Sequence, residues 1–369
     1  MELTIRVPEL VRALQRVQGI VEKKTTMPIL ANALIKSKGK DKITVSATDL
    51  EIGLTGDYDA TVVKSGAMTL GAKALYDIVR SLPEDVVTLK QGANQWVEIS
   101  CGKVKYRVVG MSADSFPTLP SFEQVPFFAL EPRIFKEMIE KTLYAVSTDE
   151  TRYNLTGVYC EQVQGSPGLR MVATDGHRLS VIERPTQEPP AMKEGVIIPR
   201  KGLVELRKLL EEGKEGGRLG FIENSAVFEK DGITLTMRLV DGRFPDYQQV
   251  IPTTSTRRVR VNKDRLSAAL KRTSLLSPDK AQGVRLDIAS GTMALTANNP
   301  DLGEAREELE VEYDNEALKI GFNFRYLMDV LAVLGEEQVE LELTDELSPG
   351  VIRGVGGEGY RAVIMPMRI

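Results

Sequence analysis

A segment that recurs three times constrains the fold of this chain more than any other feature. Each copy reads as a short strand that ends in Ala-Thr-Asp or Ala-Asn-Asn and continues into a second extended run. The copies are ITVSATDLEIGL (43–54), LRMVATDGHRLSV (169–181) and MALTANNPDLGEA (293–305). Asp49, Asp175 and Asn299 hold the same place in them, 126 and 124 residues apart. This spacing indicates an internal repeat of roughly 120 residues.

Two helical patterns accompany each copy of the repeat. In the first of them Leu10, Leu14, Val17 and Val21 share one face, at the spacing of an amphipathic helix. The second helix of each copy stops at a turn and passes into β-rich sequence, around Pro83, Gly213 and Gly335. The predicted helices span 8–24, 71–82, 131–148, 200–212, 262–276 and 323–334.

A chain of 369 residues is too long for one ordinary core. The repeat therefore predicts an α+β protein of three similar domains, each with two helices packed on antiparallel strands. We expect the joins in two extended, proline-containing segments, 115–127 and 243–258. The predicted domains are 1–122, 128–248 and 254–369.

Cysteine usage and hydropathy exclude several classes of protein. Cys101 and Cys160 stand 59 positions apart with no CxxC motif, which argues against a disulfide framework or a zinc site and for a reducing compartment. No apolar run approaches the roughly 20 residues needed to cross a bilayer. The first residues, MELTIRVPEL, contain no apolar h-region, so we expect no signal peptide there.

Charge is distributed unevenly along the chain. The net charge is −4, yet the six predicted helices hold 18 Lys and Arg against 11 Asp and Glu, while the other 282 residues hold 30 against 41. Lysine and arginine are good helix formers, which would explain the excess on any single helix. Because it recurs in three copies, the excess favours a shared basic surface that suits a phosphate backbone, with no preference for base sequence.

The single histidine, His177, lies two residues after Asp175 and raises the question of catalysis. On a strand the two would share a face, but a triad also needs a nucleophile held by a third group, and no GxSxG motif occurs. One histidine and two distant cysteines make no metal ligand set. We therefore predict a structural or binding role for His177, with no catalytic residue and no cofactor. A hydrolase that uses Asp175 and His177 is the rival interpretation.

Three segments have two interpretations each. GVGGEG (354–359) lacks the Lys-Ser/Thr of a phosphate loop and precedes a strand, which predicts a hairpin tip. KSKGKDK (36–42) is most simply a solvated hairpin, with DNA contact from a rim loop as the alternative. The C-terminal YRAVIMPMRI reads as an apolar strand that runs to the last residue. This strand either tucks into its own core or, through Met365 and Met367, offers an adaptable apolar groove to partner peptides.

Six segments in order, on this threefold repeat, resemble the bacterial DNA polymerase III β subunit family, the sliding clamps. They are MVATDGHRLSV, IIPRKGLVEL, LVDGRFPDY, LTANNP, IGFNFRYLMDVL and VIMPMRI. The resemblance runs through the whole chain and implies three DNA-clamp domains in a head-to-tail homodimeric ring, with helices lining the hole and sheets outside. It also implies a non-enzymatic processivity factor of the DNA polymerase III holoenzyme, a DNA-directed DNA polymerase. An ATP-dependent clamp loader would load the ring.

Helix packing agrees with a ring made of two chains. Packed helices lie about 8–10 Å apart, so twelve of them form a circle about 35 Å across between axes. Subtracting about half a helix thickness on each side leaves roughly 25 Å, which admits a duplex about 20 Å wide. Six helices from one chain would leave under ~10 Å by the same reasoning. One chain cannot encircle a duplex, whereas two chains can.

The resemblance implies three groups of site residues. Basic side chains would attract DNA within the hole, and Arg152 and Tyr153 of a Thr-Arg-Tyr segment would add to them. The full set is Arg12, Arg16, Lys24, Arg80, Arg152, Tyr153, Arg200, Arg207, Arg265 and Arg272. A pocket on the second and third domains would bind a short peptide of each partner: Leu155, Thr174, Gly176, His177, Arg178, Leu179, Pro245, Val250, Asn323, Tyr326, Leu347, Val363, Met365, Pro366, Met367 and Arg368. The dimer contact would join an edge strand of the first domain to the third domain: Lys103, Lys105, Tyr106, Val108, Leu275, Leu276, Glu304 and Glu307.

The resemblance also assigns roles within the pocket. Leu155, Leu179, Val250 and Met365 would form an apolar floor, and His177 with Arg178 would orient an extended peptide. Gln249 stands where a basic residue is common in the family and Asn154 where an aromatic residue can occur, so the peptide preference there stays open.

The implied partners are double-stranded DNA, a second copy of the chain and several replication proteins. The last group comprises the DNA polymerase III alpha subunit, the clamp loader, other polymerases and repair proteins. No membrane partner is implied, and the implied location is the cytoplasm, in association with the nucleoid. A repeat-built interaction scaffold that never touches nucleic acid is a third interpretation of the chain.

Overall fold

The computed structural model describes residues 1–22, 26–122, 124–165, 167–188, 190, 192, 194–212, 216–277 and 282–368. The chain divides into two compact units, each of which is described by itself. The first unit comprises Met1–Pro132 and Lys201–Leu239, and the second comprises Arg133–Arg200 and Val240–Ile369. No helix in the described ranges is long and apolar enough to cross a membrane.

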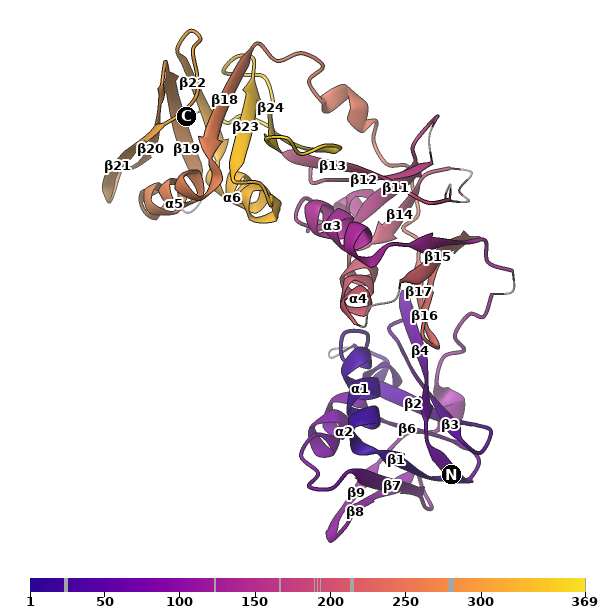
Figure 1. Ribbon diagram of the computed structural model, residues 1–369. Coiled ribbons are helices and arrows are strands. Elements are labelled where there is room, and N and C mark those ends of the chain that lie inside the picture. Colours follow the sequence, from indigo (N-terminus) through magenta and orange to yellow (C-terminus); the bar gives the residue numbers. More distant parts are fainter. Residues whose placement is uncertain are drawn as a thin grey trace. The chain divides into compact units, whose positions relative to one another are not determined.

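All six predicted helices are present, and each is shorter than its predicted range (Figure 1). They are α1 (Val7–Val17), α2 (Ala72–Val79), α3 (Pro132–Leu143), α4 (Arg200–Glu211), α5 (Lys263–Thr273) and α6 (Phe324–Val333). In α1, Pro8 lies in the first turn, where a helix needs no backbone N–H, and Leu10, Leu14 and Val17 are fully buried on one face. Val21 is also buried, but it lies beyond the end of the helix.

The first unit contains two antiparallel sheets. In spatial order, the five-stranded sheet comprises β5 (Thr61–Lys64), β1 (Glu2–Arg6), β7 (Val86–Gln91), β8 (Trp96–Cys101) and β9 (Val104–Val109). The eight-stranded sheet comprises β10 (Phe127–Leu130), β15 (Gly217–Ile222), β16 (Ser225–Lys230), β17 (Ile233–Arg238), β4 (Ile52–Asp59), β3 (Lys42–Thr48), β2 (Asn32–Lys38) and β6 (Ala67–Gly71).

The second unit also contains two antiparallel sheets. Its eight-stranded sheet comprises β14 (Val196–Pro199), β11 (Gly157–Gln162), β12 (Gly168–Thr174), β13 (Arg178–Pro185), β25 (Tyr360–Ile364), β24 (Gly350–Gly354), β23 (Gln338–Leu343) and β18 (Arg257–Asn262). Its four-stranded sheet comprises β21 (Gly303–Glu310), β20 (Thr292–Asn299), β19 (Gly283–Ala289) and β22 (Leu318–Asn323). The short 3-10 helices η1 (Pro28–Ala31) and η2 (Ala113–Ser115) belong to the first unit, and η3 (Glu150–Leu155), η4 (Tyr247–Val250) and η5 (Ser274–Leu276) belong to the second.

Both eight-stranded sheets continue from one copy of the repeat into another. In the first unit, β17 pairs antiparallel with β4, so that Leu235 lies opposite Leu54. In the second unit, β25 pairs antiparallel with β13, so that Val363 lies opposite Leu179. The strands at the same positions of the remaining copies are β9 and β21, and each of them is the last strand of its sheet. The fold therefore joins the copies through backbone hydrogen bonds and, within the described residues, leaves β9 and β21 at sheet edges.

The predicted hairpins are confirmed, and one prediction about the C-terminus is wrong. GVGGEG connects the paired strands β24 and β25, and KSKGKDK spans the turn between β2 and β3. The C-terminal strand does not run to the last residue, because β25 ends at Ile364. After Pro366, which has no N–H to donate to a ladder, only Met367 forms an isolated bridge, with Gly321. Ile369 lies outside the described residues.

Candidate partner-binding pocket

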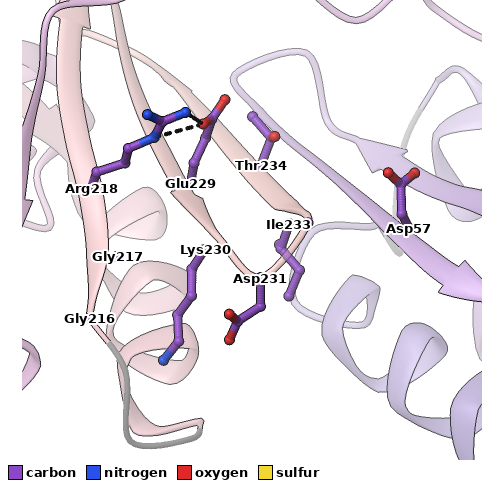
Figure 2. A pocket seen from close by; sticks show the side chains of 10 residues that line it. Asp57, Gly216, Gly217, Arg218, Glu229, Lys230, Asp231, Ile233 and Thr234 are labelled. Carbon is purple, nitrogen blue, oxygen red and sulfur yellow. Dashed lines mark hydrogen bonds and ion pairs between the residues drawn. The ribbon is translucent and has the colours of Figure 1, made fainter.

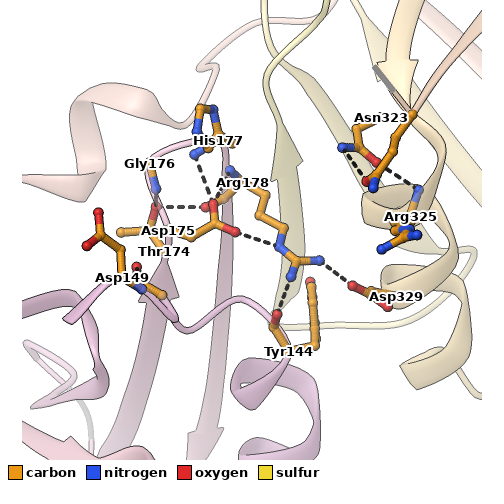
Figure 3. Close-up of polar contacts among 12 residues, drawn as sticks. Tyr144, Asp149, Thr174, Asp175, Gly176, His177, Arg178, Asn323, Arg325 and Asp329 are labelled. Atoms are coloured by element: carbon orange, nitrogen blue, oxygen red, sulfur yellow. Dashed lines mark hydrogen bonds and ion pairs between the residues drawn. The ribbon is translucent and has the colours of Figure 1, made fainter. Parts of the chain in front are cut away.

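The turn between β12 and β13 is fixed by the side chains of Thr174 and Asp175. The hydroxyl of Thr174 donates to the backbone oxygen of Arg178 at 2.7 Å and accepts from the N–H of Gly176 at 3.1 Å. Asp175 Oδ1 accepts from the N–H groups of His177 and Arg178 at 2.9 and 3.0 Å. Gly176 has φ +89°, a conformation that other residues rarely adopt. These hydrogen bonds fix the backbone from which the exposed His177 side chain projects (Figure 3).

Arg178 connects this turn to two helices that lie far away in the sequence. Its guanidinium donates to Asp175 Oδ2 at 3.0 Å, to Asp329 Oδ2 on α6 at 2.5 Å and to the backbone oxygen of Tyr144, just after α3, at 2.5 Å. It also lies over the ring of Tyr326, 4.5 Å from the centroid. Burial opposes its charge, but the hydrogen bonds and charges of both carboxylates outweigh burial and raise the pKa of Arg178. Arg178 is thus a fixed, fully charged structural link (Figure 3).

The same contacts argue against an acid–base pair at His177. One oxygen of Asp175 accepts from backbone N–H groups, and the other accepts from the guanidinium of Arg178. The imidazole instead lies beside Tyr326, with ring centroids 6.4 Å apart and planes 21° from parallel. Burial, followed by the charge of Asp175, raises the pKa of Tyr326, so its phenol stays neutral at physiological pH. The arrangement suits a surface for binding better than one for proton transfer.

The C-terminal segment lies directly against this turn. The N–H of Met365 donates to the backbone oxygen of His177 at 2.9 Å, which continues the β13–β25 pairing by one more bond. The N–H of Met367 donates to the backbone oxygen of Gly321 at 2.8 Å. Met365 has 39% of its surface exposed, Pro366 and Met367 are half-buried, and Arg368 is exposed.

The apolar residues of the predicted pocket, which include the floor residues Leu155, Leu179 and Val250, are partly buried and partly exposed. Leu155, Leu179 and Val363 are buried in one core cluster, together with Phe244 and Tyr247. By contrast, Val250 and Leu347 have 40% and 63% of their surface exposed. The buried part supports the surface, and the exposed part is available to an apolar ligand.

The remaining pocket residues have local structural roles. Asn323 caps α6, because its side chain accepts from the N–H of Arg325 at 2.9 Å. Pro245 is exposed in the segment before η4. The two residues that depart from the family pattern both form side-chain hydrogen bonds. Gln249 donates to Asp246 Oδ2 at 2.8 Å, and Asn154 donates to the backbone oxygen of Arg243 at 3.0 Å.

Sequence reasoning missed Tyr144 and Asp329, which hold Arg178. Tyr144 is half-buried, and burial is the main cause of the raised pKa of its hydroxyl, which shares a 2.8 Å hydrogen bond with the hydroxyl of Tyr360. Asp329 follows Arg178 by 151 residues. Asp329 lies within the segment IGFNFRYLMDVL and Tyr144 lies outside the six family segments, but no local pattern pairs either residue with Arg178.

The predicted DNA-binding residues of the first unit differ in exposure. The side chains of Arg12 and Arg80 are 54% and 60% exposed and pair with Glu9 and Asp77 on their own helices. Arg16 is only 11% exposed, since Glu212 and the hydroxyl of Tyr58 bind its guanidinium. Arg207 on α4 is half-buried. Lys24 lies outside the described residues.

The predicted DNA-binding residues of the second unit are all exposed. Arg152, Arg265 and Arg272 have side-chain exposures of 52%, 69% and 60%, and Tyr153 and Arg200 are also exposed. Arg272 pairs with Glu307. The hydrogen bond from Arg272 lowers the pKa of the Glu307 carboxyl, and burial opposes this shift only weakly. A predicted DNA contact and a predicted dimer contact are thus joined within one chain.

The predicted dimer residues lie on the two open sheet edges. Lys105, Tyr106 and Val108 are in β9, and Lys103 lies in the turn just before it, not in the strand as predicted. Glu304 and Glu307 are in β21, the edge strand of the four-stranded sheet. Leu275, in η5, has 76% of its surface exposed, and Leu276 is half-buried.

Among the described residues, no group of three or more His, Cys, Asp or Glu is arranged to hold a metal ion. Cys101 and Cys160 are both buried and unpaired with each other. Burial, and the charge of Glu161, raise the pKa of the Cys160 thiol well above its usual range, which keeps it unreactive.

Comparison with known proteins identifies the family. Sequence models of the N-terminal, central and C-terminal domains of the DNA polymerase III beta subunit match residues 1–120, 129–246 and 248–368. The chain is 37% identical to the beta sliding clamp of Caulobacter vibrioides and 36% identical to that of Pseudomonas aeruginosa, each over the full length of both proteins.

Solved structures give the same result. The crystal structure of the DNA polymerase III subunit beta from Pseudomonas aeruginosa superposes with a TM-score of 0.94 at 35% identity, covering all of both chains. Another structure of the Pseudomonas aeruginosa sliding clamp, bound to griselimycin, has a TM-score of 0.93 at 34% identity over the whole of both chains. The repeat, the sheet topology and these full-length matches together show that the chain belongs to the bacterial DNA polymerase III beta subunit family, the beta sliding clamps.

Proposed function

We propose that two copies of this chain close head to tail into a ring around duplex DNA and hold replication proteins on it. The family to which the chain belongs consists of DNA sliding clamps, which are processivity factors without catalytic activity. The main support for the ring is that β9 and β21 lie at sheet edges, whereas the equivalent strands of the other copies pair with each other.

The internal strand pairs indicate what should cover these edges. The strands β4, β13 and β21 hold one position in the three copies of the repeat, and β9, β17 and β25 hold another. A strand at the first position pairs with a strand at the second in two places, β4 with β17 and β13 with β25. β21 and β9 are the remaining strands at these two positions. Pairing β21 with β9 of a second copy repeats the internal contact and removes an edge that would otherwise promote aggregation.

A cation at each internal strand pair supports the same proposal. Next to β4, Lys201 at the start of α4 binds Asp49 and donates to the backbone oxygen of Ile20 at 3.1 Å, just after α1. Next to β13 the cation is Arg178, which belongs to the strand itself and not to a following helix; it binds Asp175 and the backbone oxygen of Tyr144, just after α3. Lys73 is the second residue of α2, as Lys201 is of α4. We therefore expect Lys73 of one copy near the end of α5 of the other copy.

The exposed arginines support a loose electrostatic hold on DNA. Those at Arg12, Arg80, Arg265 and Arg272 have more than half of their side chains exposed, and their ion pairs lie at the surface, where each is worth little. Such side chains exchange a carboxylate for a phosphate at low cost, which suits a ring that must slide.

The pocket beside His177 is proposed to bind a short peptide of each partner. Exposed Val250, Leu347 and Met365 offer apolar contacts to an extended peptide. The proposed partners are the DNA polymerase III alpha subunit, the ATP-dependent clamp loader, and other polymerases and repair proteins. The proposed cellular location is the cytoplasm, where the ring would encircle nucleoid DNA. The proposed domain limits remain 1–122, 128–248 and 254–369, close to the family matches.

Retention on DNA of different topology tests the ring. The loaded protein should stay on circular plasmid through a high-salt gel filtration step and be lost once the plasmid is linearised, because only a ring is held topologically. Equal loss from both forms would overturn the ring. The variant His177→Ala should keep retention on circular DNA and bind partner peptide more weakly. Loss of both together would contradict the separation of the pocket from the hole.

A further inference from the structure

A cavity of ≈ 700 Å³ lies beside the candidate pocket, within the second unit. Its walls come from β11, from the residues that lead into β14, and from the segment 242–248. Of the predicted site residues, Pro245 lines this cavity, and no predicted role uses its charged and aromatic walls. A second cavity, at Gly216–Arg218 and residues 229–234, is lined by charges of both signs. Arg218 and Glu229 already pair there, so this cavity indicates no particular ligand (Figure 2).

Aromatic rings form a rigid wall of the cavity. Tyr159 and Phe244 stack with centroids 4.9 Å apart and planes 8° from parallel, and Tyr247 lies next to Tyr159 at 6.4 Å. A Cβ at Gly195 would collide with the hydroxyl of Tyr159, so glycine allows the ring to lie against the backbone. Phe244 and Tyr247 are buried and hold the half-buried ring of Tyr159 in place, so Tyr159 provides the aromatic surface that a ligand could contact.

Carboxylates give the cavity a negative charge. Glu161 Oε1 accepts from Arg170 at 2.7 Å and from the hydroxyl of Tyr247 at 2.6 Å, but Arg170 is shared with Glu183, also at 2.7 Å. One cation therefore serves two carboxylates. Glu194 and Asp246 add two more negative charges to the lining, against the single positive charge of Arg243.

Tyr247 adds no charge of its own. Burial, followed by its hydrogen bond to Glu161, raises the pKa of the Tyr247 hydroxyl to about 12. The phenol therefore remains neutral and continues to donate to Glu161 at any physiological pH.

The cavity adjoins residues of the proposed peptide pocket. Pro245 belongs to the pocket residues and also lines the cavity, and Phe244 and Tyr247 share one core cluster with Leu155 and Leu179. An extended peptide advances about 3.3 Å per residue, so the residues that flank a bound segment reach past the edge of their pocket. A neighbouring cavity is therefore within reach of the same partner.

We propose that this cavity accepts the guanidinium of an arginine that flanks the clamp-binding segment of a partner protein, an inference that rests on the proposed peptide pocket. A guanidinium is planar, stacks on aromatic rings and pairs with carboxylates, which are the two chemistries that the lining offers. The cavity thereby favours partners with a basic flank over partners with an acidic one.

Two synthetic peptides test this inference. Both carry the same extended core of leucine and phenylalanine, and they differ only in a flank of three arginines or three serines. Fluorescence anisotropy with the full chain should show about threefold to fivefold tighter binding of the arginine peptide at low salt, with the difference shrinking at about 0.5 M salt. The variant Glu194→Gln should reduce this advantage, and Glu194→Lys should abolish it and favour a peptide with a glutamate flank.

A matched control separates the cavity from general electrostatics. Glu188→Gln removes the same charge from an exposed residue that does not line the cavity, and it should leave the arginine advantage unchanged. An equal effect of Glu188→Gln and Glu194→Gln, or equal binding of the two peptides by the unmodified chain, would overturn the inference and leave the pocket intact. Failure of both peptides to bind would overturn the peptide pocket itself.

Discussion

At the scale of single residues, Arg178 is the most constrained position in the candidate pocket. It has three anchors from different parts of the chain: Asp175 in its own turn, Asp329 on α6 and the backbone oxygen of Tyr144. Only 11% of the Arg178 side chain is exposed, so the loss of an anchor leaves an underpaired charge in a poorly solvated place. The turn that carries His177 therefore depends on residues that would never touch a bound peptide.

Removing the charge of Asp329 tests this dependence. We expect Asp329→Asn to weaken peptide binding about threefold to tenfold and to lower the free energy of unfolding by about 1–2 kcal/mol. Isothermal titration and urea unfolding measure the two quantities. Asp59→Asn, at an exposed position of β4, is the matched control and should change neither. Unaltered peptide affinity in Asp329→Asn would show that Asp175 and Tyr144 are sufficient.

The ion pairs of Glu137 make stability depend on pH. Burial opposes the charge of Glu137, but hydrogen bonds from Arg184 and Lys141 outweigh burial and lower the pKa of the carboxyl from 4.5. A lowered pKa stabilises the fold above the unfolded-state value of 4.5, and this contribution is lost as the pH falls through the folded-state pKa.

We therefore expect Glu137→Gln to lower the free energy of unfolding by about 1 kcal/mol at neutral pH, after allowance for solvent screening. The difference between variant and unmodified chain should shrink steadily below about pH 4.5. Denaturant unfolding at a series of pH values measures it. A difference that is the same in acid and at neutral pH would mean that packing, not charge, accounts for the effect.

At the scale of elements, the same hairpin tip occurs twice with nearly identical hydrogen bonds. Thr48 donates to the backbone oxygen of Ile52 at 2.9 Å, as Thr174 does to that of Arg178 at 2.7 Å. Asp49 Oδ1 accepts from two backbone N–H groups in the same way as Asp175. The copies differ at the tip, where Leu50 has φ +80° and Gly176 has φ +89°. The shared threonine and aspartate thus set the turn, and the residue at its tip sets what the turn presents.

Substituting the glycine at the tip separates backbone strain from crowding. Gly176→Ala places a Cβ 2.9 Å from Arg152 Nη1 at a positive φ, whereas Gly291→Ala, at φ +73°, meets nothing within 4 Å. Each should lower the free energy of unfolding by about 1–2 kcal/mol because of the positive φ. Only Gly176→Ala should also weaken peptide binding, which titration calorimetry would detect. Equal peptide affinity in the two variants would place the peptide away from this turn.

At the scale of the whole molecule, the open edges decide the state of assembly. Leu275 has 76% of its surface exposed close to β21, and Glu307 of β21 is held by Arg272. We expect Leu275→Lys to convert a dimer into a monomer at micromolar concentration, as measured by sedimentation velocity. The side chain of Trp96, the only tryptophan, lies on β8 beneath Arg107 of β9, so its fluorescence gives a second measurement.

A second exposed apolar residue supplies the control for this experiment. Val63 on β5 has 66% of its surface exposed, and Val63→Lys should leave the dimer intact. Persistence of the dimer in Leu275→Lys, with an unchanged dissociation constant, would place the contact elsewhere on the molecule.

The amino-acid sequence by itself determined the features that depend on local patterns. The threefold repeat, the six helices and the paired strands around Asp49, Asp175 and Asn299 follow from periodicity and turn chemistry, which act between near neighbours. The family could be recognised because six segments keep their order along the chain. Helix ends were less accurate, since burial and capping decide where each helix stops.

Only the tertiary structure decided the features that join distant residues. The contact of Arg178 with Asp329 spans 151 residues and joins two separate segments of the sequence. Arg16, which was predicted to face DNA, is instead mostly buried against Glu212. Sheet pairing also showed that β9 and β21 remain open while their counterparts are paired. The physical reason is that such contacts arise when sheets and helices pack, so no pattern of neighbouring residues encodes them.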